Sequence, residues 1–413
     1  MKKGWEIKKL GEVCSFYKKQ NMHKGLPYVG LENIESNTGR FLGSLEPQTV
    51  KSLTFHFSDK HILYGRLRPY LNKVLLPEFE GHCSTEIFPL ELTNKLLRKF
   101  LFYWLTSDDV VKKIDSTWTG ARMPRANMNQ VLEFDFGYPP LPEQQRIVSI
   151  LDEAFAAIDK AKANAEQNLK NARELFESYL QGVFDTTSSP AKRIGWKENT
   201  LKELTTKIGS GATPRGGHLS YKTEGISLVR SMNVYDREFR DTNLAFIDEA
   251  QAKELAGVTL QANDVLLNIT GASVTRCCIF PKEYLPARVN QHVSIIRPRK
   301  ELLDSRFLNF LLTSKPYKDQ LLSTGEQGAT RQAITKSQIE ALRISIPALD
   351  VQKSISHQIE ELGAETQKLE TIYQQKIANL EELKKSILQK AFAGELPLVT
   401  IAEHVELARQ RTE

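Results

Sequence analysis

The chain has 413 residues, a hydrophobic fraction of 40% and a net charge of +6. This length suggests two or three domains, and the ordinary composition excludes a disordered or collagen-like chain. The basic start MKKGWEIKKL lacks the apolar stretch of a signal peptide, and the longest apolar run is far too short to span a bilayer. We therefore expect a cytoplasmic protein that makes no membrane contact.

The charge is unevenly placed along the chain. Residues 1–140 carry 20 Lys+Arg against 15 Asp+Glu, and residues 191–350 carry 23 against 17, so their net charges are +5 and +6. Residues 141–190 carry 5 against 8 and residues 351–413 carry 8 against 10, which gives −3 and −2. A polyanion would therefore be attracted to the two basic blocks. Net charges of this size are also common in proteins that bind no nucleic acid.

The sequence contains an internal repeat of two units. Trp5 matches Trp196, FLFYWLTS (100–107) matches FLNFLLTS (307–314), and residues 120–184 align without a gap to residues 328–392. Within the ungapped stretch, Gln144 matches Gln352 and Phe184 matches Phe392. Each repeat therefore consists of a globular block and a following segment, and the following segments of the two repeats resemble each other.

The second part of each repeat predicts a long helix. Apolar residues recur in steps of four and three from Ile147 to Tyr179, and the positions 208 residues later repeat the pattern. Each helix spans roughly 42 residues, or about 63 Å. Pro142, Glu143 and Asp350 suit a helix start, and Gly394 suits a helix end.

A long helix with one apolar stripe needs a partner, and the other helix is the obvious one. We expect the two to pair antiparallel as an intramolecular coiled coil, which creates a pseudo-two-fold axis between the blocks. If Ile147 faces Ile387, then Asn168 faces Thr366 and could fix the register; an exposed Asn168 is the alternative. The tail segment IAEHVELARQ either forms a short helix that packs toward the N-terminus or is disordered.

Both blocks mix short strand-like runs with one helix. Strands punctuated by Gly and Pro are predicted for the segments HILYGRLRPYL, KVLL, DVLLNIT, CCIF and HVSIIRP. Helices are predicted for the repeated segments FLFYWLTS and FLNFLLTS. The predicted fold class is mixed α/β, with two globular α/β domains separated by the two long antiparallel helices.

Several of these segments resemble the specificity subunit of type I restriction–modification systems. Recurring pieces of that family are similar to the helix starts of this chain and to four further segments: LQKAFAGEL (388–396), GSGATPRGGHLSY (209–221), NDVLLNITGASVTRCCIF (263–280) and VNQHVSIIRP. The first block carries HILYGRLRPYLNKV (61–74) and CSTEIFPL (83–90), which are similar to another variant. Thr275 stands where a second glycine is common, and His61 replaces the usual acidic residue.

The resemblance implies a division of the chain and of its work. Residues 1–140 and 187–347 would be target recognition domains that each read half of an asymmetric DNA target. Residues 141–186 and 348–394 would be spacer helices that set the half-site distance and dock two methyltransferase subunits, and residues 395–413 a tail. Motor–nuclease subunits complete the family's complexes. The chain itself would be non-catalytic and hold no cofactor, because S-adenosylmethionine, ATP and Mg²⁺ would belong to the partners.

The motifs of catalytic sites are missing from the sequence. Pro-Pro occurs only at 139–140 and in the wrong order for an adenine methyltransferase, and GSGATPRGG lacks the Lys-Ser/Thr of a P-loop. The four cysteines form no CxxC pair and are expected to be reduced thiols, and no metal site is predicted.

Candidate DNA-binding residues are donors and acceptors beside predicted turns, because such side chains reach base edges and phosphates. They are Arg66, Arg68, Tyr70, Lys73, Arg122, Arg125 and Asn127 in the first block, and Thr213, Arg215, Arg230, Asn233, Asn268, Thr270, Ser273, Thr275, Arg276, Thr330, Arg331 and Gln332 in the second. Each of these could instead be an ordinary solvated side chain. A coiled-coil adaptor that binds proteins is the main rival function, and a stand-alone restriction enzyme is a weaker one.

Overall fold

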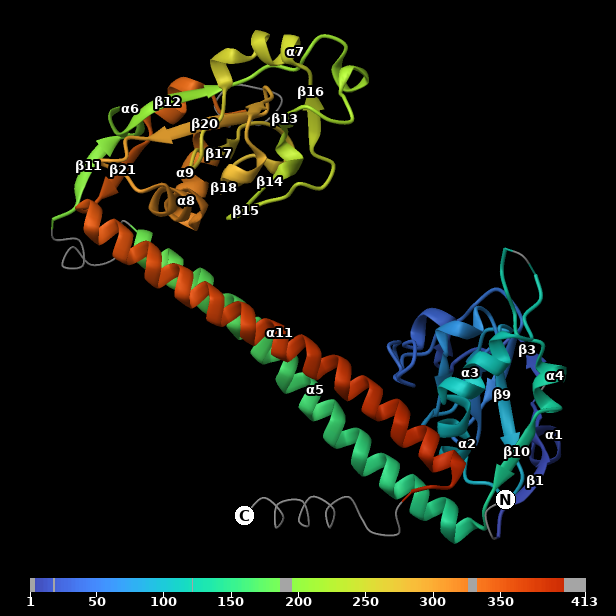
Figure 1. The fold of residues 1–413 in the computed structure, drawn as a ribbon. Coiled ribbons are helices and arrows are strands. Elements are labelled where there is room, and N and C mark those ends of the chain that lie inside the picture. Colours follow the sequence, from blue (N-terminus) through green and yellow to red (C-terminus); the bar gives the residue numbers. More distant parts are fainter. Residues whose placement is uncertain (1–3, 18, 121, 186–194, 326–332, 397–413) are drawn as a thin grey trace, which may run out of the picture. The chain divides into compact units, whose positions relative to one another are not determined.

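The computed structural model describes residues 4–17, 19–120, 122–185, 195–325 and 333–396. The chain divides into two compact units: unit 1 contains residues 1–167 and 374–413, and unit 2 contains residues 168–373. Each unit combines a globular block with parts of two long helices (Figure 1). The predicted tail helix lies outside the described residues.

The two long helices predicted from the repeat are present. They are α5 (Leu141–Phe184) and α11 (Leu349–Ala393). Glu143 and Asp350 lie in their first turns, where a carboxylate is favoured by the helix dipole. Gly394 follows α11 with a φ of 74°, a conformation that a residue with a side chain rarely adopts, so the predicted helix end is confirmed.

The helices pair antiparallel in both units. In unit 1, Asp159 and Lys162 of α5 contact Lys384 and Glu381 of α11 at 3.0 and 2.7 Å. In unit 2, Arg173 Nε lies 2.8 Å from Glu370 Oε2, and further along α5 the Tyr179 hydroxyl lies 3.5 Å from Gln358. In each unit, partner numbers fall along α11 as numbers rise along α5, which confirms the predicted direction.

The predicted register contact between Asn168 and Thr366 is wrong. The side chain of Asn168 is exposed, whereas that of Thr366 is buried. The Thr366 hydroxyl donates within its own helix, to the carbonyl oxygens of Leu362 and Gly363, both at 3.0 Å. Asn168 therefore follows the solvated face, which was the alternative left open by the heptad pattern.

The block of unit 1 is built on three small sheets. The strands are β1 (Glu6–Lys9), β2 (Cys14–Phe16), β3 (Gln20–Asn21), β4 (Tyr28–Val29), β5 (Thr54–Phe57), β6 (Ile62–Gly65), β7 (Val74–Leu75), β8 (Gly81–Cys83), β9 (Ile87–Leu92) and β10 (Asp135–Tyr138). The sheets have the orders β1-β10, β2-β9-β6-β7 and β3-β5-β8-β4. The helices are α1 (Leu10–Val13), α2 (Arg98–Leu105), α3 (Asp108–Asp115) and α4 (Met128–Leu132), with 3-10 turns η1 (Leu31–Asn33) and η2 (Pro69–Leu71).

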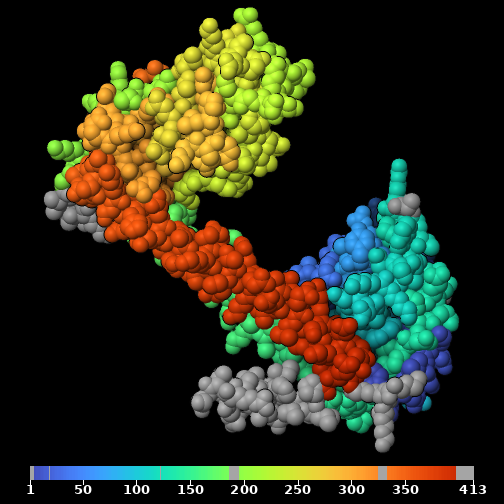
Figure 2. All heavy atoms as spheres, in the orientation of Figure 1, coloured from blue at the N-terminus to red at the C-terminus, as the bar shows by residue number. Residues whose placement is uncertain are grey.

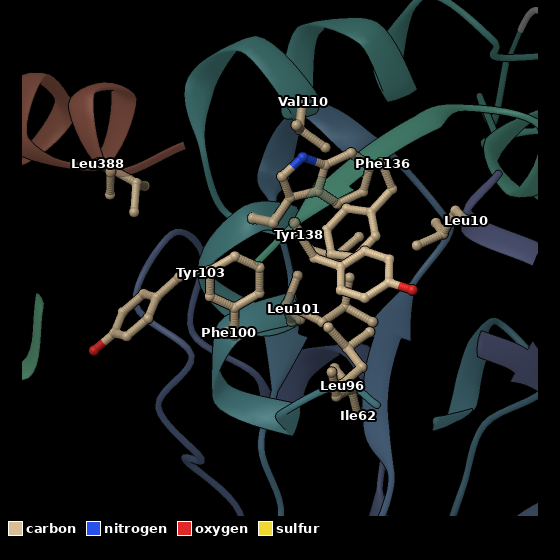
Figure 3. Close-up of a cluster of buried hydrophobic side chains, with 14 of the residues drawn as sticks. Leu10, Ile62, Leu96, Phe100, Leu101, Tyr103, Val110, Phe136, Tyr138 and Leu388 are labelled. Carbon is tan, nitrogen blue, oxygen red and sulfur yellow. The ribbon is translucent and has the colours of Figure 1, made fainter. Parts of the chain in front are cut away.

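The main core of unit 1 gathers around α2 (Figure 3). The ring of Phe100 contacts Trp5 at 6.3 Å, Phe136 at 6.2 Å and Phe392 of α11 at 5.2 Å between centroids. Leu388 of α11 points toward the same cluster. The block is therefore packed against the end of the helix that belongs to the second repeat.

Unit 2 repeats this plan with additional strands. Its strands are β11 (Lys197–Thr200), β12 (Thr205–Ser210), β13 (Ile226–Val229), β14 (Val234–Tyr235), β15 (Glu238–Phe239), β16 (Ala245–Ile247), β17 (Val265–Asn268), β18 (Cys277–Ile279), β19 (Ala287–Val289), β20 (Val293–Pro298) and β21 (Arg343–Ile346). They form sheets β11-β21, β12-β20-β17-β18, β16-β13-β19 and β14-β15. The helices are α6 (Leu201–Leu204), α7 (Glu249–Glu254), α8 (Ser305–Thr313), α9 (Lys315–Gly325) and α10 (Lys336–Ala341), and the 3-10 turns are η4 (Gly217–Ser220), η5 (Ser231–Asn233), η6 (Ala256–Val258), η7 (Gly271–Ser273) and η8 (Lys282–Tyr284).

The core of unit 2 uses the repeated aromatic residues in the same way. Phe307 of α8, the counterpart of Phe100, contacts Trp196 at 5.9 Å and Phe184 of α5 at 5.3 Å between ring centroids. Phe184 and Phe307 are both almost completely buried. The matches between Trp5 and Trp196 and between Phe392 and Phe184 thus preserve one packing arrangement in both units.

A buried glutamine joins each block to the start of its following helix. Gln352 Oε1 accepts from the Asp304 N–H at 3.0 Å, and its Nε2 donates to the carbonyl oxygens of Leu302 and Pro347, both at 2.9 Å. Gln144 makes the corresponding three bonds in unit 1, to Leu97 N–H and the carbonyl oxygens of Lys95 and Pro139. This explains why the glutamine recurs in the sequence repeat.

The residue directly before β6 in unit 1 is a histidine, whereas the residue directly before the equivalent strand β17 in unit 2 is an aspartate. In unit 2, the buried Asp264 accepts two bonds from Arg297, both at 2.7 Å, and one from the Gln261 N–H. In unit 1, His61 holds this place with an exposed fraction of 7%. Its Nδ1 accepts from the Ser58 N–H at 3.0 Å, and its Nε2 has no hydrogen-bond partner within the described residues.

We expect His61 to make unit 1 less stable at acidic pH. Burial holds the pKa of His61 below its ordinary value of 6.5, so the folded side chain stays neutral where the unfolded one is protonated. The unfolded chain then binds more protons as the pH falls below 6.5, and the free energy of unfolding drops. Urea unfolding of the full chain between pH 7.5 and 5 should show a shallower pH slope for His61→Gln than for the wild type. Identical slopes would rule out this role of His61.

Candidate nucleic-acid interface

A turn and a hairpin lie side by side in unit 1. The turn is the segment 66–73 that connects β6 to β7, and the hairpin is formed by residues 117–126. The Arg68 N–H donates to the Pro124 carbonyl at 2.7 Å, and the Ala126 N–H donates to the Arg66 carbonyl at 2.9 Å. The described residues of the hairpin, 117–120 and 122–126, extend away from the sheets of the block (Figures 1 and 2). Backbone pairing therefore brings the two predicted basic segments of the first block together.

Glu86 lies between the two segments and binds an arginine from each. Its carboxylate accepts from Arg66 Nε at 3.0 Å and from Arg125 Nε and Nη2 at 3.0 and 2.9 Å. Burial alone would raise the pKa of Glu86, but the hydrogen bonds and charges of Arg125 and Arg66 outweigh it and hold the pKa below its ordinary value. Two arginines on one carboxylate leave this site with a net positive charge.

Other predicted residues of the first block are exposed on the same two segments. Arg68 and Arg122 are exposed, and Tyr70 has an exposed fraction of 52%. Trp118 and Met123 of the hairpin, which were not predicted, are 51% and 46% exposed. Cationic and aromatic side chains on a projecting loop are a typical composition for a nucleic-acid contact.

The last two candidates of the first block are used inside the protein. Lys73 Nζ donates to the Leu31 carbonyl at 2.6 Å, which fixes the end of the turn. Asn127 caps α4 by accepting from the Gln130 N–H at 3.4 Å. Although Lys73 and Asn127 lie beside the candidate interface, their side chains stabilise the fold through these internal hydrogen bonds.

Unit 2 repeats the turn between β17 and β18 with residues 269–276. The Ile334 N–H donates to the Ile269 carbonyl at 2.8 Å, which corresponds to the bond between Ala126 and Arg66 in unit 1. Thr275 has a φ of 70°, and Asn72 at the equivalent place in unit 1 has a φ of 45°. Both turns therefore adopt the left-handed conformation at this position, although neither has a glycine there. The predicted residues Thr330, Arg331 and Gln332 lie outside the described residues.

Three of the predicted residues of the second block are buried: Asn233, Asn268 and Thr275. Asn233 donates to the carbonyl oxygens of Arg240 and Thr242, and Asn268 donates to the Ser231 carbonyl at 2.9 Å and to Ser273 Oγ at 3.1 Å. These side chains hold the turns in shape, and their amides do not reach the surface.

Three arginines of the second block, Arg230, Arg240 and Arg276, lie over aromatic rings. The Arg276 guanidinium lies 4.6 Å from the centroid of Tyr235, and the Arg240 guanidinium lies 3.8 Å from the same centroid. Arg230 lies 5.4 Å from the Tyr221 ring and also donates to the Asn243 carbonyl. Stacking of this kind orients a guanidinium while leaving donors available to a ligand.

The glycine-rich segment 209–221 approaches the β19–β20 loop closely. A Cβ added to Gly211 would lie 1.8 Å from the Val289 carbonyl oxygen, so only glycine fits there. Thr213 donates to the Gln291 Oε1, and Thr270 bonds to His292 Nδ1 at 2.6 Å. Arg215 is exposed on the same segment.

Sequence reasoning missed Glu86, Gln291 and His292, although all three connect predicted residues. Glu86 is an anion and was outside a search for cations, amides and hydroxyls. Gln291 is an amide, but it directly precedes the HVSIIRP segment, which was read as a strand and not as a turn. The available signal was that VNQHVSIIRP and CSTEIFPL occupy equivalent places, after β19 and β8, in the two blocks.

The described residues contain no cluster of three or more His, Cys, Asp or Glu side chains that could hold a metal ion. The four cysteines are buried and free, and burial raises the pKa of Cys14 and Cys278 to about 12. Within the same part of the chain, none of the helices has the length and apolar character that crossing a membrane requires.

The fold belongs to a class of protein in which one chain contains two similar α/β blocks and two long antiparallel helices. A family model described as "Type I restriction modification DNA specificity domain" matches the chain twice, at residues 2–170 and 193–381. The chain therefore belongs to the family of type I restriction modification DNA specificity proteins.

Known members of the family differ in how much of the chain they match. The chain is 27% identical over 177 residues to the EcoDI specificity subunit of Escherichia coli, a match that covers 42% of this chain and 39% of the relative. It is 23% identical to the putative MjaX specificity subunit of Methanocaldococcus jannaschii over 96% of this chain and 94% of the relative.

Solved structures show the same fold. A structure titled as the basis of complex assembly and conformational transition of the type I R-M system has a TM-score of 0.76 at 22% identity, and it covers 96% of this chain and 99% of its own. The crystal structure of the HsdS subunit from Thermoanaerobacter tengcongensis has a TM-score of 0.66 at 21% identity, covering 96% and 98%.

Proposed function

We propose that the chain is the DNA sequence-recognition subunit of a type I restriction–modification enzyme. The carrying observation is that the chain contains two specificity domains, and that in each block the turn with candidate contact residues pairs with a second segment, through Leu67 and Arg125 in the first block and Thr270 and Ala333 in the second. Each block reads one half of a bipartite target. Because the two blocks present different side chains at equivalent positions, the two half-sites differ in sequence.

The long helices suit the role of a spacer and docking surface. Much of each helix is exposed, and the basic blocks and slightly acidic helices favour DNA on the blocks. The proposed partners on the helices are two methyltransferase subunits, joined by motor–nuclease subunits in the cytoplasm. S-adenosylmethionine, ATP and Mg²⁺ serve those partners, and this chain is non-catalytic.

The proposed contact residues are the predicted side chains that remain at the surface. They are Arg66, Arg68, Tyr70, Arg122 and Arg125 in the first block and Thr213, Arg215, Arg230, Thr270, Ser273 and Arg276 in the second, with Thr330, Arg331 and Gln332 retained from the sequence. Arg125 has most of its donors on Glu86 and the Met123 carbonyl, so besides any contact with DNA it also holds the hairpin against Glu86.

We expect Arg68→Ala and Arg276→Ala to weaken DNA binding in distinguishable ways. A base reader should lose about 10- to 100-fold preference for its base, whereas a phosphate contact should weaken all sequences evenly and reduce the salt slope by about one. Duplex binding by the full chain at several salt concentrations would separate the two outcomes.

Lys376→Ala provides the matched control, because Lys376 is an exposed cation on α11. It should leave DNA affinity and salt slope unchanged. Duplex binding that shows no salt dependence would instead favour the rival adaptor function, since a protein that binds DNA phosphates must release counterions.

A further inference from the structure

Three segments of the second block meet at one chain of hydrogen bonds. The Thr213 hydroxyl donates to Gln291 Oε1, Gln291 Nε2 lies 3.0 Å from His292 Nε2, and His292 Nδ1 lies 2.6 Å from the Thr270 hydroxyl. These residues come from the glycine-rich segment, the β19–β20 loop and the β17–β18 turn. The four side chains therefore connect the proposed contact segments to one another.

The backbone of the β19–β20 loop is fixed from both sides. The His292 N–H donates to Asn290 Oδ1 at 3.0 Å, and the His292 carbonyl accepts from the Ile269 N–H at 3.0 Å. On the other side, the Gly211 N–H donates to the Asn290 carbonyl at 3.1 Å. A side chain on such a loop loses little further backbone freedom when it binds.

The chain of bonds also has a direction. In the orientation that the Gln291 amide has here, its Nε2 can only donate, so His292 Nε2 is the acceptor and the ring N–H is on Nδ1, which faces Thr270. The Thr213 hydroxyl donates to the other end of the amide. Both ends of the Gln291 amide are thus held in a single orientation.

Gln291 keeps half of its hydrogen-bonding capacity. A glutamine amide has two N–H donors and two acceptor lone pairs, and the chain of bonds uses one of each. The side chain is exposed, so one donor and one acceptor remain side by side at the surface. Adenine presents the complementary pair in the major groove, an N7 acceptor beside an N6 donor, whereas guanine presents two acceptors.

We infer that Gln291 reads an adenine in the half-site of the second block, and that His292 is a positioning residue that holds its amide. This inference rests on the proposed function and names a specificity-determining residue for it.

The first block carries different groups at the equivalent place. Val29 pairs with Cys83 as Val229 pairs with Val289, so the loop Ser84–Glu86 corresponds to Asn290–His292. Thr85 then stands in the place of Gln291, and Glu86 in that of His292. Glu86 binds Arg66 and Arg125 beside the 66–73 turn, and His292 contacts the equivalent 269–276 turn through Thr270. The same structural position thus holds different side chains in the two blocks.

The test is selection of bound sequences from a pool of randomised duplexes by the full chain. Wild type should enrich a bipartite sequence with an adenine that Gln291→Ala no longer prefers, a loss of about tenfold or more at that position alone. Gln261→Ala, which changes an exposed glutamine in the turn before β17, should keep the wild-type sequence. An unchanged preference in Gln291→Ala would overturn the inference, whereas enrichment of no sequence by the wild type would overturn the proposed function itself.

The positioning role of His292 needs a separate comparison. His292→Leu removes the acceptor and should relax the same base position as Gln291→Ala, whereas His292→Gln supplies a carbonyl acceptor and should retain most of the preference. Equal selectivity of the two His292 variants, or a change at other positions of the target, would show that His292 does not act through Gln291.

Discussion

Gln352→Ala is expected to lower the free energy of unfolding by about 3–5 kcal/mol, because three buried or partly buried backbone groups lose their partner at once. The side chain is completely buried and binds the Asp304 N–H and the carbonyl oxygens of Leu302 and Pro347. Each buried group left unpaired costs roughly 1–3 kcal/mol, and partial entry of water reduces the sum. Urea unfolding of the full chain, followed by circular dichroism and tryptophan fluorescence, measures the loss.

Gln144→Ala should have an effect of similar size, since Gln144 makes the same three kinds of bond at distances of 2.8 to 3.0 Å. The matched controls are Gln367→Ala and Gln374→Ala, which shorten exposed glutamines of α11. These should change stability by less than about 0.5 kcal/mol. If all four variants unfolded at the wild-type urea concentration, the buried glutamines would not be the connection between block and helix.

The long helices could be predicted from sequence because their signal is local and occurs twice. Ile147, Leu151, Ala154 and Ile158 are buried as the periodic pattern required. The error at Asn168 has a general physical cause. A straight helix drifts by about 20° per heptad against a strict seven-residue repeat, so a position counted onto the apolar stripe over several heptads can face outward. The match between the two helices gave no information about which side of the stripe Asn168 would occupy.

Some strands of the blocks could be predicted from the sequence, but their pairing could not. β6, β7, β17, β18 and β20 lie within the segments predicted as strands. The order β2-β9-β6-β7 depends on contacts between residues far apart in the chain, and short strands of two to six residues carry no pattern that selects a partner. The sequence repeat indicates that the two blocks have similar folds, but it does not give the order in which their strands pair.

The structure brings candidate segments of the predicted interface together, but it buries some of the candidate side chains. Arg68 and Arg122 are exposed as expected, but Asn233 and Asn268 are buried because their amides satisfy backbone groups in tight turns. An asparagine beside a predicted turn suits both roles equally well. Only the three-dimensional structure shows that Gln291 is the amide left at the surface.

Asp264→Ala is expected to destabilise unit 2 by about 3–5 kcal/mol. The carboxylate is fully buried, whereas 20% of the Arg297 side chain is exposed, and two bonds of 2.7 Å join them. Removing one partner of such a pair leaves the other charge without compensation in a poorly solvated place, which costs more than the pair itself contributes. The Gln261 N–H also loses its acceptor.

The double variant Asp264→Leu/Arg297→Met separates these costs. Because it removes both charges and keeps apolar volume, it should recover at least half of the stability lost in Asp264→Ala. Glu198→Ala is the surface control, since its ion pair with Arg343 has side chains 60% and 69% exposed and should contribute less than about 1 kcal/mol. Equal losses in Asp264→Ala and Glu198→Ala would contradict the argument. A change in DNA selectivity with unchanged stability would contradict it too, because Asp264 supports the β17–β18 turn by holding the start of β17 and makes no surface contact of its own.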